Sequence, residues 1–189
     1  MPDAALFDLI RSQDGTQLAA SAPFLIELRQ IGFADSQAAA RSLARLMSDP
    51  DRHAAFIGFA PHLFEALSSA GSPDRVLASF ERFLFGAADP LAMYRFLAQR
   101  PRAVEMLVRL FSGSQFLGEI LLRNPEYLEN LLDRRRLAQV KTREKLFLEA
   151  RLEAGPFDAP VDRLDALRRF QRLELLRIGA CDLLGLFDL

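Results

Sequence analysis

The sequence predicts an all-α fold: a multi-helix bundle of about ten to twelve short helices that ends in one or two long helices, with no sheet. Apolar residues recur at the helical spacing i, i+3, i+4 and i+7, as in Val104, Leu107, Val108 and Phe111. Residues that cap helices stand directly before proline at Asp49-Pro50, Ser72-Pro73, Asp89-Pro90 and Asn124-Pro125. Period-two alternation is absent, and no Asn-Gly or Asp-Gly turn joins two β-branched runs, so no strand is expected.

Each capping residue before a proline predicts a helix start. Its side-chain oxygen can accept a hydrogen bond from a first-turn amide, and proline fits the first helical position because its missing N–H would have no partner there. Gly71, Gly86 and Gly113 stand where the preceding helices are expected to end. In chain order, these signals and the apolar periodicity predict helices at 3–12, 22–31, 35–48, 50–57, 60–70, 73–85, 90–99, 101–111, 114–123, 125–132, 134–153 and 161–186.

The stretch from Pro101 to Leu132 is expected to form the centre of the bundle. Ala103, Met106 and Leu110 widen the apolar face of its first helix and leave only a narrow polar stripe. A helix that is apolar on most sides is normally packed on most sides.

The domain organisation expected from composition is a helical core over 1–153, then a break, then a long C-terminal helix over 161–189. The break is the segment 154–160, which contains Gly155, Pro156 and Pro160. It is either a linker or a corner between two long helices. The last helix is expected to lead into a further domain.

Composition excludes several classes of function. The chain has 189 residues, 50% hydrophobic and 26% charged, with a formal net charge of −1. No global charge would attract nucleic acid or an anionic membrane. A signal peptide and a run of ~18 apolar residues are both absent, and the single Cys181 fits a reducing compartment. A soluble cytoplasmic protein without nucleic-acid or membrane partners is predicted.

Candidate catalytic residues have simpler structural interpretations. Asp49-Pro50-Asp51 matches the D-x-D motif of two-metal nucleotidyl transfer. The first aspartate is better explained as a helix cap, and the second as a first-turn acid that interacts favourably with the helix dipole. His53 and His62 have no neighbours that would complete a zinc site. Cys181 has no histidine near it in the sequence, so a buried structural thiol is expected.

The segment 133–154 is the most basic part of the chain, with seven Lys or Arg against four Asp or Glu. A nucleic-acid patch is conceivable there, but the interleaved acids Glu144, Glu149 and Glu153 favour a solvated helix face.

The last helix is expected to bury a seam formed by Leu173, Leu176, Ala180 and Leu183. Arg177 and Asp182 flank its apolar end, where a charge either pairs within the bundle or contacts a further domain. The residues predicted for such an interdomain contact are Arg177, Asp182, Leu183, Leu186 and Phe187. Without that domain, Leu183, Leu184, Leu186 and Phe187 would form an exposed apolar patch, so self-association is expected.

Four motifs in order carry a family resemblance. They are Phe80-Glu81-Arg82-Phe83-Leu84, Tyr94-Arg95-Phe96-Leu97-Ala98, Ser114-Gln115-Phe116-Leu117 with Arg123-Asn124-Pro125-Glu126, and Leu176-Arg177-Ile178 with Asp182-Leu183. Together they resemble the helical region that precedes the first nucleotidyltransferase domain in the bacterial glutamine-synthetase adenylyltransferase/adenylyl-removing family. The resemblance covers roughly residues 60–189 and departs at Gly179-Ala180-Cys181, where the family commonly has an arginine before the aspartate.

The resemblance implies that full-length members use ATP and Mg²⁺ in two nucleotidyltransferase domains. One domain adds AMP to a tyrosine of glutamine synthetase and the other removes it by phosphorolysis, under the control of nitrogen-regulatory proteins. The family's catalytic aspartates lie on a sheet, and no residue here matches them, so no catalytic, cofactor-binding or metal residue is expected in this chain. The chain is therefore interpreted as the N-terminal, helical, non-catalytic portion of such an enzyme, inactive alone.

A free-standing helical protein-interaction module is the alternative. The reading frame downstream distinguishes the two, because an in-frame Gly-Ser turn followed by D-x-D is expected only for an enzyme of this family.

Overall fold

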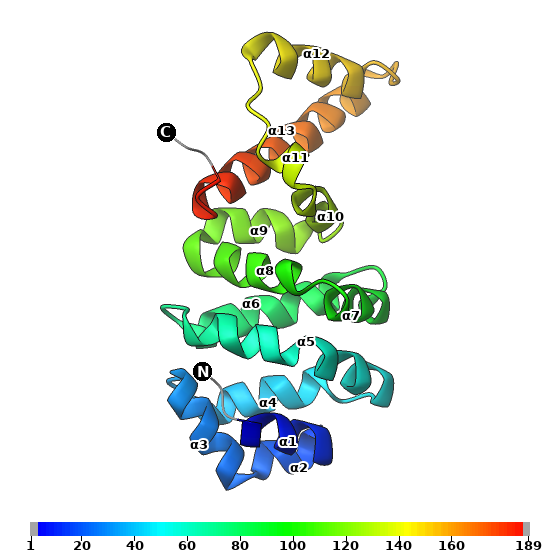
Figure 1. The fold of residues 1–189 in the computed structure, drawn as a ribbon. Coiled ribbons are helices and arrows are strands. Elements are labelled where there is room, and N and C mark those ends of the chain that lie inside the picture. Colours follow the sequence, from blue (N-terminus) through cyan, green and yellow to red (C-terminus); the bar gives the residue numbers. More distant parts are fainter. Residues whose placement is uncertain (1–3, 187–189) are drawn as a thin grey trace. The chain divides into compact units, whose positions relative to one another are not determined.

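The computed structural model describes residues 4–186, apart from the side chain of Arg134, and confirms the all-α prediction. Within these residues there are thirteen helices and no strand (Figure 1). The helices are α1 (Ala4–Ser12), α2 (Gly15–Ala20), α3 (Ala22–Ile31), α4 (Ser36–Leu46), α5 (Pro50–Ser68), α6 (Pro73–Gly86), α7 (Pro90–Ala98), α8 (Pro101–Gly113), α9 (Gln115–Arg123), α10 (Tyr127–Leu132), α11 (Arg134–Leu137), α12 (Arg143–Ala154) and α13 (Pro160–Leu183).

The chain divides into two compact units, Met1–Pro125 and Glu126–Leu189. This division falls elsewhere than the expected break at 154–160. That segment joins α12 to α13, two helices of the second unit that pack against each other, which agrees with the corner that was one of its two alternatives. The nucleotidyltransferase domain expected after residue 189 stays a prediction.

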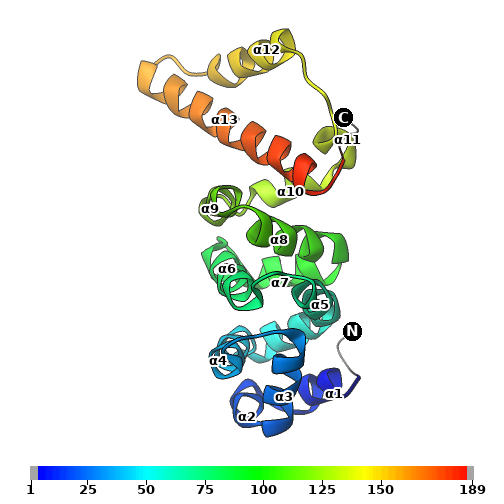
Figure 2. The same ribbon diagram turned by 90° about the vertical axis from the view of Figure 1, so that its left-hand side faces the viewer.

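The helices of the first unit stack in layers. Figure 2 shows α2, α4, α6 and α9 nearly end on in one column, and α2 packs on α4, α4 on α6, and α6 on α9. Beside this column α3 packs on α5, and α5 packs on α7 and α8. The sequence contains no regular repeat that corresponds to these layers. None is needed, because a layer can stack on its neighbours whenever its helices present apolar faces to them.

Phe59 lies at the centre of the first unit. Its ring centroid is 5.1 Å from that of Phe56, 6.0 Å from that of Phe80 and 5.7 Å from that of Tyr94, so it joins α5, α6 and α7. All four rings are fully buried, and the Tyr94 hydroxyl donates a 2.9 Å hydrogen bond to the Leu46 carbonyl. Burial raises the pKa of Tyr94. These four rings therefore form one connected aromatic core.

Three of the four helix starts predicted at a capping residue followed by proline are confirmed. Asp49 and Asp89 cap α5 and α7 with their side chains, and α6 begins at Pro73 after Ser72, which makes no side-chain capping bond. The fourth predicted start, at Asn124-Pro125, is wrong, because Asn124 is the C-terminal cap of α9. Its side-chain amide donates to the Ile120 carbonyl at 2.8 Å, and α10 begins only at Tyr127.

Two helix ends are set by left-handed glycines that were not singled out in the sequence. Gly32 (φ 109°) ends α3, and Gly185 (φ 63°) follows α13. In each case the amide of the residue after the glycine donates a hydrogen bond to a carbonyl of the last helical turn. Phe33 donates to Leu28 and Leu186 donates to Cys181, and both ends are Schellman motifs. Gly86 and Gly113 end their helices as predicted, and Gly71 follows the end of α5.

The separate helices predicted at 50–57 and 60–70 are wrong, because α5 runs unbroken through Pro61. An internal proline removes one helical hydrogen bond and costs about 3 kcal/mol. Phe56 and Phe59 before it and Leu63 and Phe64 after it are all fully buried, and burying such side chains outweighs that cost. The short helix α2 was not predicted at all.

The single helix predicted over 134–153 is also wrong. The chain forms α11 over Arg134–Leu137, extends over 138–142, and begins α12 at Arg143, where the Thr142 side chain accepts from the Lys145 amide at 3.3 Å. Leu137 is buried and α12 buries no residue.

Gly15→Ala should destabilise the first unit by about 1–3 kcal/mol through overpacking. A Cβ at Gly15 would lie 2.8 Å from the Ala44 carbonyl oxygen, a backbone atom that cannot turn aside. Urea unfolding measures the loss. Gly71→Ala is the matched control, because a Cβ there meets nothing within 4 Å; equal stability of the Gly15 variant and wild type would contradict the packing described.

Candidate functional site

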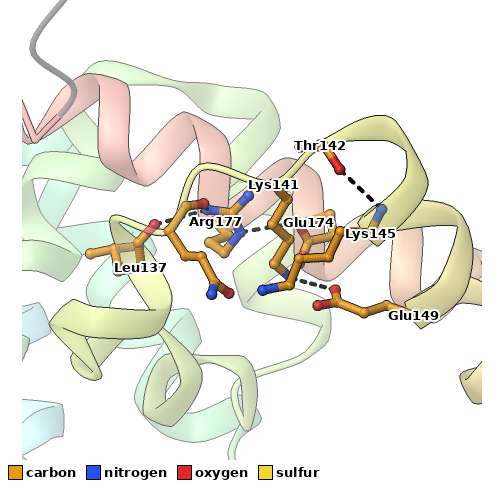
Figure 3. Close-up of polar contacts among 8 residues, drawn as sticks. Leu137, Lys141, Thr142, Lys145, Glu149, Glu174 and Arg177 are labelled. Atoms are coloured by element: carbon orange, nitrogen blue, oxygen red, sulfur yellow. Dashed lines mark hydrogen bonds and ion pairs between the residues drawn. The ribbon is translucent and has the colours of Figure 1, made fainter.

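Four charged side chains meet in the second unit, between α12, α13 and the extended segment before α12 (Figure 3). The Lys141 Nζ lies 2.6 Å from the Glu149 Oε2 and 2.6 Å from the Glu174 Oε1. The other Glu174 oxygen accepts from the Arg177 Nε at 3.0 Å. Glu174 therefore stands between two cations, and the four charges cancel.

Arg177 also binds the backbone of the segment that leaves α11. Its Nη1 donates to the carbonyls of Leu137 (2.9 Å) and Gln139 (2.8 Å). The Cys181 Sγ, one turn further along α13, donates to the same Leu137 carbonyl at 2.7 Å. These bonds satisfy the carbonyls that would continue a helix beyond Leu137, which explains why the chain turns away there.

The electrostatics of this cluster are those of a closed network. Burial opposes the charged form of Lys141, but hydrogen bonds to Glu149 and Glu174 outweigh it and raise the pKa of Lys141. Burial raises the pKa of the Cys181 thiol, which keeps it protonated and able to donate. Only 9% of the Arg177 side chain and 11% of the Glu174 side chain are exposed, so each charge depends on its partner for solvation.

An open pocket of about 280 Å³ adjoins the network. Its walls include Lys141, Glu149, Glu174 and Arg177, together with the apolar side chains of Leu152 and Phe170. The four charged groups point into contacts with one another, so their chemistry here is to hold α12, α13 and the 138–142 segment together.

A second polar cluster joins α4 to α6 in the first unit. Glu81 accepts from Arg45 through both of its oxygens, at 2.5 Å from Nε and 2.9 Å from Nη2, and also from the Ser42 hydroxyl. Burial would raise the pKa of Glu81, but the hydrogen bonds from Arg45 and Ser42 outweigh it and lower that pKa. The ionised carboxylate thus links the two helices.

The residues predicted for an interdomain contact have different surroundings. Arg177 is paired inside the second unit, which was one of the two alternatives left open. Asp182 is exposed, and Leu183 and Leu186 are half-buried at the end of α13. Phe187 lies outside the described residues. The interdomain role itself stays a prediction.

The remaining candidates take structural positions. Asp49 accepts from the Asp51 and Arg52 amides at 3.0 and 3.1 Å, as a cap does. The His53 Nε2 lies 2.7 Å from the Ile10 carbonyl oxygen, and Cys181 is fully buried as expected. Among residues 4–186, no group of three His, Cys, Asp or Glu side chains is placed to hold a metal ion. No helix of this part of the chain is long and apolar enough to cross a membrane.

The first motif of the family resemblance performs structural tasks. Phe80, Phe83 and Leu84 are buried, while between them Glu81 binds Arg45 and Arg82 pairs with Glu119 at 3.2 Å. This motif therefore fills the core of the first unit and joins α6 to α4 and α9.

Sequence reasoning missed most of the network. The charge pattern of 133–154 predicts a solvated basic helix, which is wrong for Lys141, since only 11% of its side chain is exposed. The i, i+3 spacing of Glu174 and Arg177 is the one local signal that indicated a pair. Lys141 and Glu174 are 33 residues apart, and nothing local predicts their contact.

Comparison with known proteins gives consistent results. The family described as Glutamate-ammonia ligase adenylyltransferase matches residues 104–189. Relatives named "Bifunctional glutamine synthetase adenylyltransferase/adenylyl-removing enzyme" include those of Thioalkalivibrio sulfidiphilus (32% identical over 68% of this chain and 14% of the relative), Mycobacterium marinum (29%, over 86% and 17%) and Bradyrhizobium diazoefficiens (31%, over 75% and 14%). No solved structure matches the chain significantly.

The fold and the network define the described part of the chain as an all-helical framework held by packed aromatic rings and buried ion pairs. The resemblance to the bacterial glutamine-synthetase adenylyltransferase/adenylyl-removing family is confirmed, and the chain is similar to a short region of those enzymes. It spans about 14–17% of the length of the three relatives named above.

Arg177→Met should destabilise the second unit by about 3–5 kcal/mol, because Glu174 loses one of its two cations. The Gln139 carbonyl also loses its side-chain donor, and the Leu137 carbonyl keeps only the Cys181 thiol. Urea unfolding followed by circular dichroism measures the loss. The matched control is Arg136→Met, since Arg136 is 76% exposed and forms only a 3.4 Å surface pair with Asp133; that pair is worth about 0–1 kcal/mol. Equal losses in the two variants would contradict the role given to the network.

The Glu81 cluster should make the stability of the first unit acid-sensitive. The pKa of Glu81 is lower in the folded protein than its ordinary value of 4.5, so its contribution is full above that value and is lost as the pH falls through the folded pKa. Urea midpoints for wild type and Glu81→Gln, measured from about pH 7 down to about pH 3, should converge at the acid end. Curves that run parallel over the whole range would show that Glu81 carries no such stabilisation.

Proposed function

We propose that this chain is a helical, non-catalytic portion of a glutamine-synthetase adenylyltransferase-like enzyme. The observation that carries the proposal is the family match over residues 104–189, which runs from α8 to the end of the chain and includes the whole charge network. The named relatives are about five times as long as this chain, since 131 and 165 matched residues make up 14% and 17% of their lengths, and they carry both activities in their names. This agrees with a chain that corresponds to one piece of such an enzyme.

The partners follow from this proposal. Glutamine synthetase is the substrate protein that the relatives' names state. We propose that it, a nitrogen-regulatory protein and a nucleotidyltransferase domain are partners of the assembly to which this chain contributes, in the cytoplasm and without nucleic acid. ATP and Mg²⁺ would bind to that nucleotidyltransferase domain, and the helices of this chain would position it.

A chimaera tests the proposal directly. The 131-residue region of the Thioalkalivibrio sulfidiphilus relative that matches this chain is replaced by the matching region of this chain, and AMP transfer to glutamine synthetase is measured. We expect transfer to be retained, whereas an unrelated helical segment of the same length, the matched control, should abolish it. A folded chimaera without activity would contradict the proposal.

The proposal that this chain is non-catalytic has its own assay. The purified chain is mixed with glutamine synthetase, Mg²⁺ and ATP labelled at the α-phosphate, and no label should reach glutamine synthetase. Transfer by this chain alone would overturn that part of the proposal. The downstream reading frame separates a portion of an enzyme from a free-standing interaction module.

A further inference from the structure

The long helix α13 carries a stripe of exposed side chains along most of its length. Six positions spaced alternately three and four residues apart are all exposed: Val161, Leu164, Arg168, Gln171, Leu175 and Ile178. The four apolar members are 68%, 48%, 41% and 43% exposed in chain order. Alternating steps of three and four residues form the seam by which one helix pairs with another.

This stripe lies opposite the face by which α13 is held in its own unit. Ala166, Leu176 and Ala180 are buried, and at about 100° per residue they lie on the far side of the helix from Leu164, Leu175 and Ile178. α13 is thus apolar on two sides, one of which is covered within the unit.

Exposed apolar side chains are concentrated in the second unit. Of the twelve large hydrophobic residues exposed in the described part of the chain, nine belong to that unit and three to the first, although the first is nearly twice as long. The second unit therefore leaves uncovered an apolar surface that the first does not.

The stripe is complementary to itself when two copies of α13 run antiparallel. If Val161 lies opposite Ile178 of a second copy, Leu164 falls opposite its Leu175 and Arg168 opposite its Gln171, and the same pairs recur in the other direction. Apolar pairs then occupy both ends and polar pairs the centre. Six positions match in one register, over a length of about 26 Å at 1.5 Å per residue.

The charges beside the stripe agree with the same register. Asp165 and Arg172 flank it on the same side, one heptad apart, and Asp165 also accepts a 2.9 Å hydrogen bond from Arg168 of its own helix. In the antiparallel register Asp165 of each copy comes within two residues of the level of Arg172 of the other, which gives two ion pairs related by the two-fold axis. In a parallel pair these residues of the two copies would lie on opposite sides of the seam and could not pair with each other.

We infer that the outer stripe of α13 binds a second copy of this chain, as an antiparallel helix pair about a two-fold axis. The central Arg168 and Gln171 set the register, as polar residues in a helical seam do at a cost in stability. A single helix pair lies at the small end of specific interfaces, so the dimer forms with modest affinity and at raised concentration. This inference is independent of the proposed function, and AMP transfer does not bear on it.

Sedimentation velocity over a range of concentrations tests the inference with the full chain. Wild type should shift from monomer to dimer as concentration rises. Leu164→Glu and Leu175→Lys should each raise the dimer dissociation constant at least about tenfold, a change of about 1.4 kcal/mol in binding. The double variant should regain much of the affinity, since in this register each new carboxylate faces a new ammonium group.

Leu148→Glu on α12 is the matched control, because Leu148 is 57% exposed in the same unit but lies off the stripe. It should leave dimerisation unchanged, and circular dichroism should show equal helicity for all variants. A wild-type chain that stays monomeric, loss of the dimer through Leu148→Glu but not Leu164→Glu, or a double variant as weak as the single ones would each overturn the antiparallel pairing.

Discussion

The second unit depends on the ion pairs that the Glu174 carboxylate forms with Lys141 and Arg177. A unit of 64 residues can bury only a limited apolar surface, and here α12 buries no residue at all. Glu174 instead binds Lys141 from the extended segment and Arg177 from its own helix, and Arg177 holds the backbone of that segment. Charges that are costly to bury singly are buried together here, because each provides solvation that water no longer gives. The loss of one partner therefore leaves the others uncompensated.

The two units solve the same packing problem by different means. In the first, Phe59 and its aromatic neighbours fill the space between layers, and Glu81 adds one polar link between α4 and α6. In the second, ion pairs replace much of that apolar contact. The uncovered apolar surface of α12 and α13 is consistent with a unit built to contact other polypeptide, whether the rest of a larger enzyme or a second copy.

Sequence reasoning reached the fold class and most helices because caps, prolines and apolar spacing are local signals. It failed where tertiary contact overrides them. Pro61 lies within α5 because the core on both sides holds the helix, and the helix predicted over 134–153 breaks because Arg177 captures its carbonyls. Arg177 was identified as a charge in need of a partner, but Lys141 was not, since its partners are brought to it only by the fold.

The most direct test of this account is a double-mutant cycle between Lys141 and Glu174, using Lys141→Met and Glu174→Gln in urea unfolding. Because the two groups share a buried network, the losses should be non-additive, with a coupling energy of about 1–3 kcal/mol. Additivity within about 0.5 kcal/mol would show that the two residues contribute independently, and would contradict the view that a closed charge network holds this part of the chain together.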